Sequence, residues 1–397
     1  MINKKEEIPI TNPKLKEVSS SSRILTIGIL KERNKDEKRV ALTPYAVQTI
    51  IGTGHIVLTE KGAGLGANYS DEDYRIAGAR ISDRKSLIKQ SDIIVKIGPL
   101  TYEEIQEIPK NKIIFSALHP NTQTKENIEL LLKKYVIAIA YEYYQDHRGL
   151  NPFTYLMNEI IGSTSIMIAA ELLTNTTGGK GIMLGGLTGI TPSSVMVIGT
   201  DIAAEYAIRI ALGLGASVKV FDDDINGLLR MEQLFGQHLF TSSLNRKALT
   251  KVLQSADVII NSKIKRHEQS YIITEDMVKL MRSGSVIIDM KIDSGSVIET
   301  SVPTTFEKPI FTKYGVIHYC VPNIPSRVSR TASMAISDVL APILLDICKE
   351  GGIIPLIKRS ESLRSGTYIF QGILMNLQLA KRFDMDAKDW NIILPLL

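Results

Sequence analysis

The sequence of 397 residues has few cysteines, no long apolar run and little net charge. Two thiols, Cys320 and Cys348, build no disulfide framework in a chain of this length. Cys320 sits in an apolar run, so we expect a buried thiol there, in a reducing, cytoplasmic setting. No segment reaches the roughly 20 apolar residues that a bilayer-spanning helix needs, and we therefore expect no membrane association. The net charge of +5 comes from scattered lysines and arginines rather than a basic block, so we expect no nucleic-acid partner.

The first 22 residues are polar, include the serine run Ser19–Ser22 and lack the apolar stretch of a secretory signal. We expect a flexible tail there. Short apolar runs then alternate with amphipathic stretches, which predict strands over residues 24–30, 55–58, 92–97, 112–118 and 136–141 and helices over 43–51, 71–77 and 125–134. This alternation predicts a mostly parallel sheet.

A second unit with the same alternation follows. A long apolar helix is predicted over residues 158–174, and the glycine-rich stretch 178–189 separates it from strands at 195–198, 217–221, 258–260, 286–289 and 316–320. A second long apolar helix is predicted over 330–350, and the rest of the chain is expected to be helical. The sequence therefore predicts an α/β fold with two domains.

The clearest motif lies at residues 195–215, where a buried strand, a tight turn and an amphipathic helix follow one another. In a dinucleotide site one glycine allows the turn, a second lets the backbone approach the pyrophosphate, and a third position packs helix against strand. An acidic residue about 20 positions on holds the ribose. Gly199 supplies the first position, Ala204 the third and Asp222 the ribose carboxylate, but the middle position holds Asp201.

Asp201 places a negative side chain at a helix N-terminus that should receive the phosphates. Its carboxylate can cap the helix by itself and satisfy the N–H groups that phosphates would use. Two interpretations stay open: a unit that keeps the fold but has lost or weakened its nucleotide, and a displaced but functional binding mode. Both predict the same strand–turn–helix fold.

Residues 23–352 resemble alanine dehydrogenase and, less closely, the soluble subunit of proton-translocating transhydrogenase. The matching segments stand in one order along the chain, at residues 27–28, 31–32, 39–44, 62–66, 118–119, 178–189, 211–216, 284–293, 318–323 and 330–331. No single segment identifies the family, but so many matching segments in the same order do.

The resemblance implies a reversible reaction in which L-alanine, water and NAD give pyruvate, ammonia and NADH. It also implies a Rossmann-type NAD-binding domain, residues 151–321, inserted into a discontinuous α/β substrate domain made of residues 23–150 and 322–397. Two long helices would link the domains. The family usually forms hexamers, so we expect a homo-oligomer acting on a small molecule, and we expect no metal centre.

Three residues match catalytic or substrate-binding positions of that family. Arg39 stands where the family's arginine holds the substrate carboxylate, which a guanidinium can grip bidentately. His119 matches the histidine that exchanges a proton with the reacting oxygen, and an imidazole titrates near neutral pH. Asp293 matches the aspartate that handles the amino group or the attacking water.

The substrate side of the cleft departs from the family at one catalytic position. Gly98 replaces a lysine that, by the resemblance, contacts the substrate carbonyl. Lys96 lies two residues earlier and is a candidate substrate ligand, although two residues along a strand correspond to roughly 6–7 Å.

The resemblance assigns Asn158, Lys263 and Asn323 to the cofactor cleft, and Lys263 and Lys291 replace smaller residues there. Two interpretations stay open. The changes are drift after loss of function, or they form a rewritten site in which a lysine pairs with Asp201 or replaces the ammonium missing at residue 98.

The sequence is therefore compatible with three functions. An NAD-dependent alanine dehydrogenase has the greatest weight of matching segments. A catalytically impaired relative that binds a keto acid, or that regulates or co-assembles with an active enzyme, is favoured by the residues at 98 and 201. An enzyme for another amino or keto acid with a different nucleotide is the third.

Overall fold

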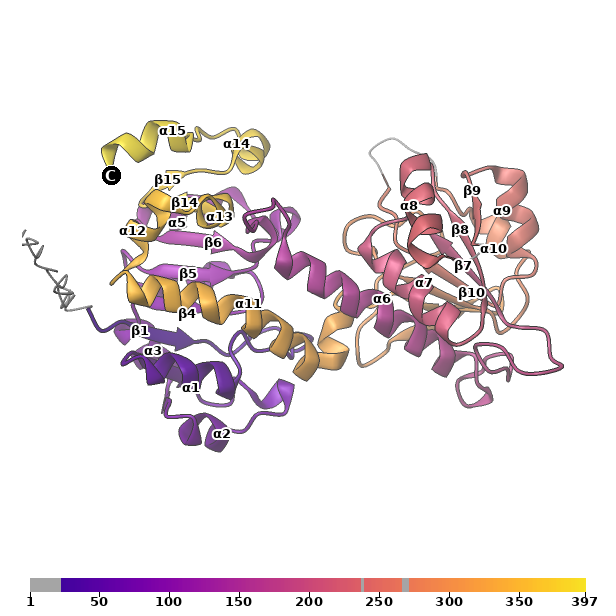
Figure 1. The fold of residues 1–397 in the computed structure, drawn as a ribbon, viewed down its shortest axis with the longest axis horizontal. Coiled ribbons are helices and arrows are strands. Elements are labelled where there is room, and N and C mark those ends of the chain that lie inside the picture. Colours follow the sequence, from indigo (N-terminus) through magenta and orange to yellow (C-terminus); the bar gives the residue numbers. More distant parts are fainter. Residues whose placement is uncertain (1–22, 237–238, 266–270) are drawn as a thin grey trace, which may run out of the picture.

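The chain folds into two α/β domains joined by two long helices (Figure 1). The computed structural model describes residues 23–236, 239–265 and 271–397, and the tail expected over residues 1–22 lies outside these ranges. Each domain has its own sheet and hydrophobic core. The predicted fold class, a two-domain α/β protein with a Rossmann-type unit, is confirmed.

The first domain contains an eight-stranded sheet in the order β15-β14-β6-β5-β4-β1-β2-β3. Strands β1 to β6 run parallel, while β14 pairs antiparallel with β6 and β15 antiparallel with β14. The bounds are β1 Thr26–Ile29, β2 Ile56–Glu60, β3 Arg80–Ser82, β4 Ile93–Val95, β5 Ile113–Ser116, β6 Ile137–Ala140, β14 Thr367–Phe370 and β15 Ile373–Leu374.

Both faces of this sheet are buried, which explains why its inner strands are apolar without alternation. Ile93 and Val95 of β4 belong to one core cluster and Ile94 to the other. The covering helices are α1 Pro44–Gly52, α2 Asp71–Ile76, α3 Arg84–Gln90, α4 Tyr102–Glu107, α5 Lys125–Lys133, α12 Ile353–Arg359, α13 Glu361–Gly366, α14 Leu377–Phe383 and α15 Trp390–Ile393. Short 3₁₀ turns lie at η1 Leu65–Ala67, η2 Pro120–Thr122, η3 Tyr141–Tyr143 and η6 Leu394–Leu396.

The second domain contains a seven-stranded sheet in the order β12-β13-β11-β10-β7-β8-β9. All neighbours are parallel except β12, which pairs antiparallel with β13. The bounds are β7 Ser194–Ile198, β8 Ser217–Phe221, β9 Phe240–Ser242, β10 Val258–Asn261, β11 Val286–Asp289, β12 Ile310–Lys313 and β13 Val316–Tyr319. The strand order reverses between β7 and its neighbour β10, as in a doubly wound nucleotide-binding sheet.

Four helices belong to this second sheet: α7 Ile202–Gly213, α8 Ile225–Phe235, α9 Arg246–Leu253 and α10 Glu275–Val278, with 3₁₀ turns at η4 Asn175–Thr177 and η5 Ile324–Val328. Helix α7 is rich in alanine on its buried face, where Ala203, Ala204 and Ala207 have no exposed surface. These small residues let the helix pack closely on the strands.

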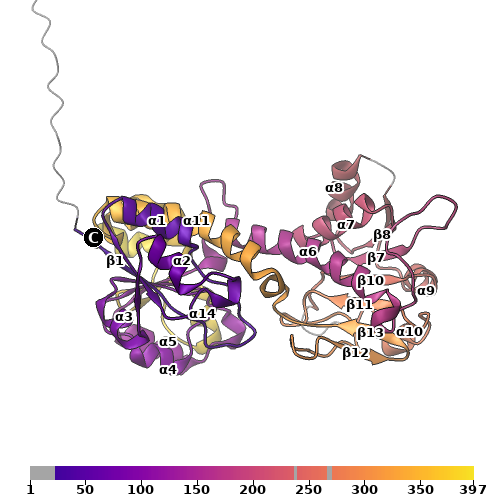
Figure 2. The same cartoon turned by 90° about the horizontal axis from the view of Figure 1, so that it is seen from below.

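Two 21-residue helices, α6 Pro152–Leu172 and α11 Ser329–Lys349, contact each other and pass between the domains (Figure 2). Helix α6 crosses α7 at Gly162, where a Cβ atom would lie 2.1 Å from the backbone oxygen of Ala203. Only glycine therefore fits at this crossing. The tight contact fixes the linking helix against the helix that follows the predicted nucleotide loop.

Several sequence predictions need correction. The residues after α11 are not only helical, because β14 and β15 add two strands to the first sheet. Helix α6 begins at Pro152 rather than residue 158, since Asn151 caps it by accepting a hydrogen bond from Thr154 N.

Residues 324–349 contain no run of roughly 20 apolar residues, but by length and average hydropathy they form one helix that could cross a bilayer, with a mean hydropathy of 1.6 over their best window. More than half of that window is buried, and Ile336, Leu340 and Leu344 of α11 lie in the core of the first domain. The hydropathy of α11 thus reflects its position as a core helix.

Candidate active site

The residues predicted to bind the cofactor follow the carboxyl ends of parallel strands in the second sheet. Gly199 follows β7, Asp222 follows β8, Lys263 comes two residues after β10, and Lys291 comes two residues after β11. Because β7 and β10 adjoin at the point where the strand order reverses, these side chains meet at the edge where α/β sheets bind ligands.

Gly199 has the conformation that the first position of a nucleotide loop requires. Its φ angle is +112°, and a Cβ atom there would lie 3.1 Å from the carbonyl carbon of Ser262. Both the left-handed backbone and the close approach of the β10 loop favour glycine. The turn therefore keeps the shape of a nucleotide loop.

Asp201 occupies the N-terminus of α7. Its Oδ1 accepts a hydrogen bond from the backbone N–H of Ala204 at 2.9 Å, so the side chain caps the helix as predicted. The same oxygen accepts from the Ser262 hydroxyl, and Oδ2 lies 2.9 Å from the Lys291 ammonium. A carboxylate with a lysine counter-ion thus stands at the position where the pyrophosphate of a dinucleotide would be expected.

Asp222 is buried and makes three internal hydrogen bonds. Its Oδ2 accepts from Thr200 Oγ1 at 2.8 Å, and its Oδ1 accepts from Lys263 Nζ at 2.6 Å and from Asp224 N at 3.1 Å. Lys263 also pairs with Asp223. Burial alone would raise the pKa of Asp222, but the hydrogen bonds to its carboxylate, of which that from Lys263 has the largest effect, together outweigh burial and lower the pKa to about 2. The carboxylate predicted to bind the ribose is therefore ionised, and both of its oxygens already accept hydrogen bonds within the protein.

The structure resolves which lysine meets which aspartate. Lys291 pairs with Asp201, as one of the two interpretations of the sequence allowed, and Lys263 pairs with Asp222 and Asp223 instead. Each of the two lysines is about 15% exposed at its side chain. Both anchor points of the expected nucleotide therefore hold internal ion pairs.

Arg39 lies at the junction of the two domains. Its Nε and NH2 donate to the two carboxylate oxygens of Glu37, at 2.7 and 2.5 Å, while NH1 faces Met157 Sδ at 3.3 Å. Glu37 also accepts from Asn323 Nδ2 at 3.0 Å. Burial would raise the pKa of Glu37, but the Arg39 guanidinium outweighs it and lowers the pKa. Asn323, which the resemblance assigns to the cofactor cleft, and Arg39, which is predicted to bind the substrate carboxylate, thus share Glu37 as a hydrogen-bond partner.

Lys96 lies within a buried ionic network rather than at an open surface. Its side chain is 3% exposed, its Nζ is 2.8 Å from Glu104 and 3.4 Å from Glu32, and it donates to the backbone oxygen of Pro99. Direct contact with a substrate would require these bonds to break. The predicted role of Lys96 in substrate binding stays a prediction.

His119 is exposed and has an unusual backbone conformation. Its φ angle is +46°, which non-glycine residues rarely adopt. Oε1 of Glu142 accepts hydrogen bonds from the backbone N–H groups of Leu118 and His119, at 2.8 and 2.6 Å. Glu142 thus holds the strained turn that carries the predicted catalytic histidine. Glu142 could not be predicted from the sequence, because nothing in the local pattern connects it to a residue 23 positions earlier.

Asp293 is exposed on the turn after β11, where its carboxylate accepts a hydrogen bond from Ser294 Oγ at 3.1 Å. Asp289, by contrast, is fully buried and accepts from Asn261 Nδ2 at 2.8 Å. Asn158 lies on α6 and donates to the backbone oxygen of Thr154 in its own helix. No hydrogen bond or ion pair joins Arg39, His119 and Asp293 directly within the described ranges.

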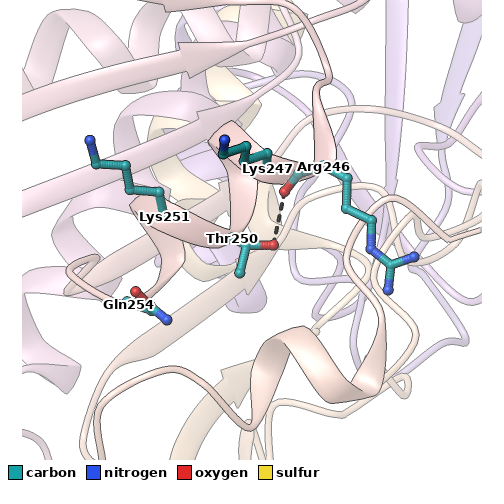
Figure 3. Close-up of a pocket in the computed structure, with 5 residues that line it drawn as sticks. All are labelled: Arg246, Lys247, Thr250, Lys251 and Gln254. Atoms are coloured by element: carbon teal, nitrogen blue, oxygen red, sulfur yellow. Dashed lines mark hydrogen bonds between the residues drawn. The ribbon is translucent and has the colours of Figure 1, made fainter.

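One hollow borders the predicted substrate side. It has a volume of about 610 Å³ between the N-terminal turns of α4 and α5, directly after Gly98 and His119 in sequence, and its lining includes Pro99, Thr101, Thr122 and Gln123. A second hollow of about 540 Å³ lies on α9, where the Thr250 hydroxyl bonds to the backbone oxygen of Arg246 (Figure 3). Its lining contains none of the predicted site residues. Over the part of the chain that the structure describes, no cluster of side chains suited to a metal ion occurs.

Comparison with known proteins places this geometry in a family. The alanine dehydrogenase/PNT N-terminal domain matches residues 28–161, and the corresponding C-terminal domain matches residues 165–376. Alanine dehydrogenase 2 of Staphylococcus aureus is 34% identical over 366 residues, covering 92% of this chain and 98% of that protein.

Solved structures agree with this match. An L-alanine dehydrogenase structure aligns with a TM-score of 0.83 at 30% identity, over 91% of this chain and 99% of the other. A transhydrogenase from Sinorhizobium meliloti shares the fold, with a TM-score of 0.74 at 20% identity over 88% and 98% of the two chains. The domain matches, the relative and the aligned structure agree along nearly the whole sequence, and the chain belongs to the alanine dehydrogenase/PNT family.

Proposed function

We propose that the protein is an oxidoreductase that interconverts L-alanine and pyruvate: L-alanine, water and NAD⁺ give pyruvate, NH₄⁺, NADH and a proton. The observation that carries this proposal is the way in which Arg39 is held. Glu37 accepts from the N–H of Nε and from one N–H of NH2, and NH1 donates to Met157 Sδ, so two of the five guanidinium N–H groups, one on NH1 and one on NH2, are left for a ligand.

The NH1–NH2 end of Arg39 can bind a substrate carboxylate in a bidentate manner while Glu37 keeps the guanidinium in place. Because Asn323 bonds Glu37, this end also lies beside the segment that leaves the nucleotide domain. His119 would exchange the proton of the reacting oxygen, and Asp293 would handle the amino group or the attacking water.

The residues at the second sheet's edge fit a dinucleotide in part. The Gly199 turn keeps the space that a Cβ atom would fill, and Asp222 keeps the ribose carboxylate. Gly199, Asp222 and Lys291 would hold NAD, which when bound would supply the hydride acceptor of the reaction. Asp201 opposes the bound phosphates with its own charge, so we expect weak NAD affinity.

A direct test measures NADH formation from L-alanine at alkaline pH. We expect His119→Ala to lower this activity by roughly 10²–10⁴-fold, the usual contribution of a general acid–base. His147→Ala is the matched control, because His147 is an exposed histidine on a turn outside the site. No NAD binding in a stoichiometric titration would end the proposal, as would equal activity in the two variants.

A second function is favoured by the two internal ion pairs, Asp201–Lys291 and Asp222–Lys263. They satisfy the nucleotide anchors without a nucleotide, which suits a catalytically impaired relative that binds a keto acid at Arg39 or assembles with an active enzyme. This alternative predicts that pyruvate stabilises the protein against thermal unfolding while NAD does not. Stabilisation by both ligands would exclude it.

A further inference from the structure

Gly98, in place of the family's lysine, leaves an open space beside Glu32. A Cβ atom built on Gly98 meets only one atom within 4 Å among the described residues, Oε2 of Glu32 at 3.1 Å. A lysine at this position would fill the space with a four-carbon stem and an ammonium group. Gly98 therefore leaves space for a chain of that size, next to a carboxylate.

The Glu32 carboxylate is placed to accept hydrogen bonds. Its Oε1 accepts from Ile97 N at 2.6 Å, while its Oε2 lies 3.3 Å from Gly98 N and 3.4 Å from Lys96 Nζ. The side chain is 7% exposed. Each of these contacts comes from a donor, and the two contacts of Oε2 are long, so this oxygen can accept a further and shorter hydrogen bond from a cation.

The ion pairs around Glu32 contain one cation fewer than carboxylates. Within the described ranges they join three cations, Arg33, Arg84 and Lys96, to four carboxylates, Glu32, Glu60, Glu104 and Glu107. Lys96 is shared, and its Nζ lies closer to Glu104, at 2.8 Å, than to Glu32. Burial raises the pKa of Glu32, and Lys96 lowers it only in part. A second cation beside Oε2 would therefore stabilise the ionised carboxylate.

The two carboxylates whose charges act on Glu32, Glu37 and Glu104, are already bonded at both oxygens. Arg39 donates to both oxygens of Glu37, and Asn323 donates to it as well. The two oxygens of Glu104 accept from Arg84 at 2.7 Å and from Lys96 at 2.8 Å. Of these three carboxylates, Glu32 is thus the one with an oxygen left for a ligand cation.

Glu32 also lies within electrostatic reach of Arg39, which is proposed to hold the substrate carboxylate. Burial lowers the pKa of Arg39, but Glu37 and, with a smaller effect, Glu32 raise it. A molecule whose carboxylate binds Arg39 can therefore place a cation at Glu32 when a short carbon chain separates the two groups.

We propose that this site prefers, over L-alanine, amino acids whose side chain ends in an ammonium group, which occupies the space beside Gly98 and pairs with Oε2 of Glu32. The substrate would bring the charge that a lysine at residue 98 supplies in the family. This inference rests on the proposed function, because it assumes that an amino acid binds Arg39 and is oxidised at its α-carbon. The diamino acid, water and NAD⁺ give the keto acid with its side-chain ammonium unchanged, NH₄⁺, NADH and a proton.

The test compares ligands that differ only in the side-chain ammonium: L-ornithine with L-norvaline, and L-2,4-diaminobutyrate with L-2-aminobutyrate. Calorimetric titration of the full-length protein at one fixed, neutral pH without nucleotide gives the affinities. In the wild type we expect the ammonium to raise affinity about tenfold in at least one pair, as for one charge-assisted hydrogen bond. We expect kcat/KM for NADH formation to follow the same order.

Glu32→Gln removes the negative charge and should abolish the preference within each pair. Glu72→Gln is the matched control, because Glu72 is an exposed carboxylate of the same domain that pairs with Arg75 on α2, outside the ion pairs around Glu32. This variant should keep the preference.

No preference in the wild type, or a preference that persists in Glu32→Gln, would overturn the inference. If L-alanine still yields NADH in that case, the proposed function stands. If no amino acid, charged or uncharged, binds or is oxidised, the proposed function fails as well.

Gly98→Lys provides an independent variant if Glu32→Gln does not fold. Its ammonium would fill the space, pair with Glu32 and repel a second cation, so we expect the preference for L-ornithine and L-2,4-diaminobutyrate to vanish. Thermal unfolding of every variant shows that it is folded before titration. A preference of wild-type size in Gly98→Lys would contradict the assignment of the ammonium to this space.

Discussion

The Asp201 carboxylate and the Lys291 ammonium lie 2.9 Å apart, although 90 positions separate them in sequence. Asp201 comes from the turn after β7 and Lys291 from the turn after β11, two strands that both pair with β10. The N-terminus of α7 and the Lys291 ammonium both stabilise the Asp201 carboxylate, which occupies the place of an anionic ligand. A nucleotide phosphate that binds at the N-terminus of α7 would therefore have to compete with Asp201 for Lys291.

Asp201→Gly should strengthen NAD binding. The substitution removes the carboxylate from the N-terminus of α7 and frees Lys291 for phosphate, and we expect a gain of about tenfold in affinity by calorimetry. Asp83→Gly removes a comparable helix cap, on α3 of the other domain, and should leave NAD affinity unchanged. A null effect of Asp201→Gly would mean that residues 98 and 263 also limit binding.

Lys263→Met should alter acid stability. The pKa of Asp222 is depressed to about 2 in the folded protein, below the usual value of about 3.9, so its stabilisation is present above about pH 4 and is lost as pH falls toward 2. Without Lys263 the pKa rises and the stability difference across this window shrinks. Denaturant unfolding at pH 6 and in this acid window measures it, and an unchanged difference would contradict the ion pair.

Glu142→Ala should impair any activity that depends on His119. The variant removes the acceptor for two backbone N–H groups and releases the strained turn at His119, so we expect at least a tenfold loss in kcat/KM. Glu142→Gln keeps an amide oxygen as acceptor and should retain most of the activity. Equal losses in the two variants would instead indicate that the charge of Glu142 matters.

Gly162→Ala should destabilise the fold by about 1–3 kcal/mol, because its Cβ atom would overlap the backbone of α7 and the two helices would have to separate. Gly213→Ala is the control. Gly213 lies at the end of α7, a Cβ atom there meets nothing within 4 Å among the described residues, and alanine should stabilise the helix by about 0.4–1 kcal/mol. Urea unfolding compares the two, and similar values would refute the tight α6–α7 crossing.

Much of the fold could be predicted because its signals are local. The apolar runs predicted ten strands of the two sheets, with boundaries within a residue or two of those observed. The loop pattern alone also predicted that Asp201 caps a helix. The short edge strands β3, β9, β12 and β15, and the short strand β14 between β15 and β6, could not be predicted. A strand of two to four residues has little periodicity. Strand β14 forms because β6 offers an edge with which to pair, and β15 then pairs with β14.

The sequence by itself determined the family, the alternation of strands and helices, and the placing of Gly199, Asp201 and Asp222 at strand ends. Tertiary structure decided the partners: Lys291 for Asp201, Lys263 for Asp222, Glu37 for Arg39 and Glu32 beside Gly98. The reason is physical. Capping and periodicity act over a few residues, whereas ion pairs depend on which strands adjoin in the sheet, and that order arises only when the whole core packs.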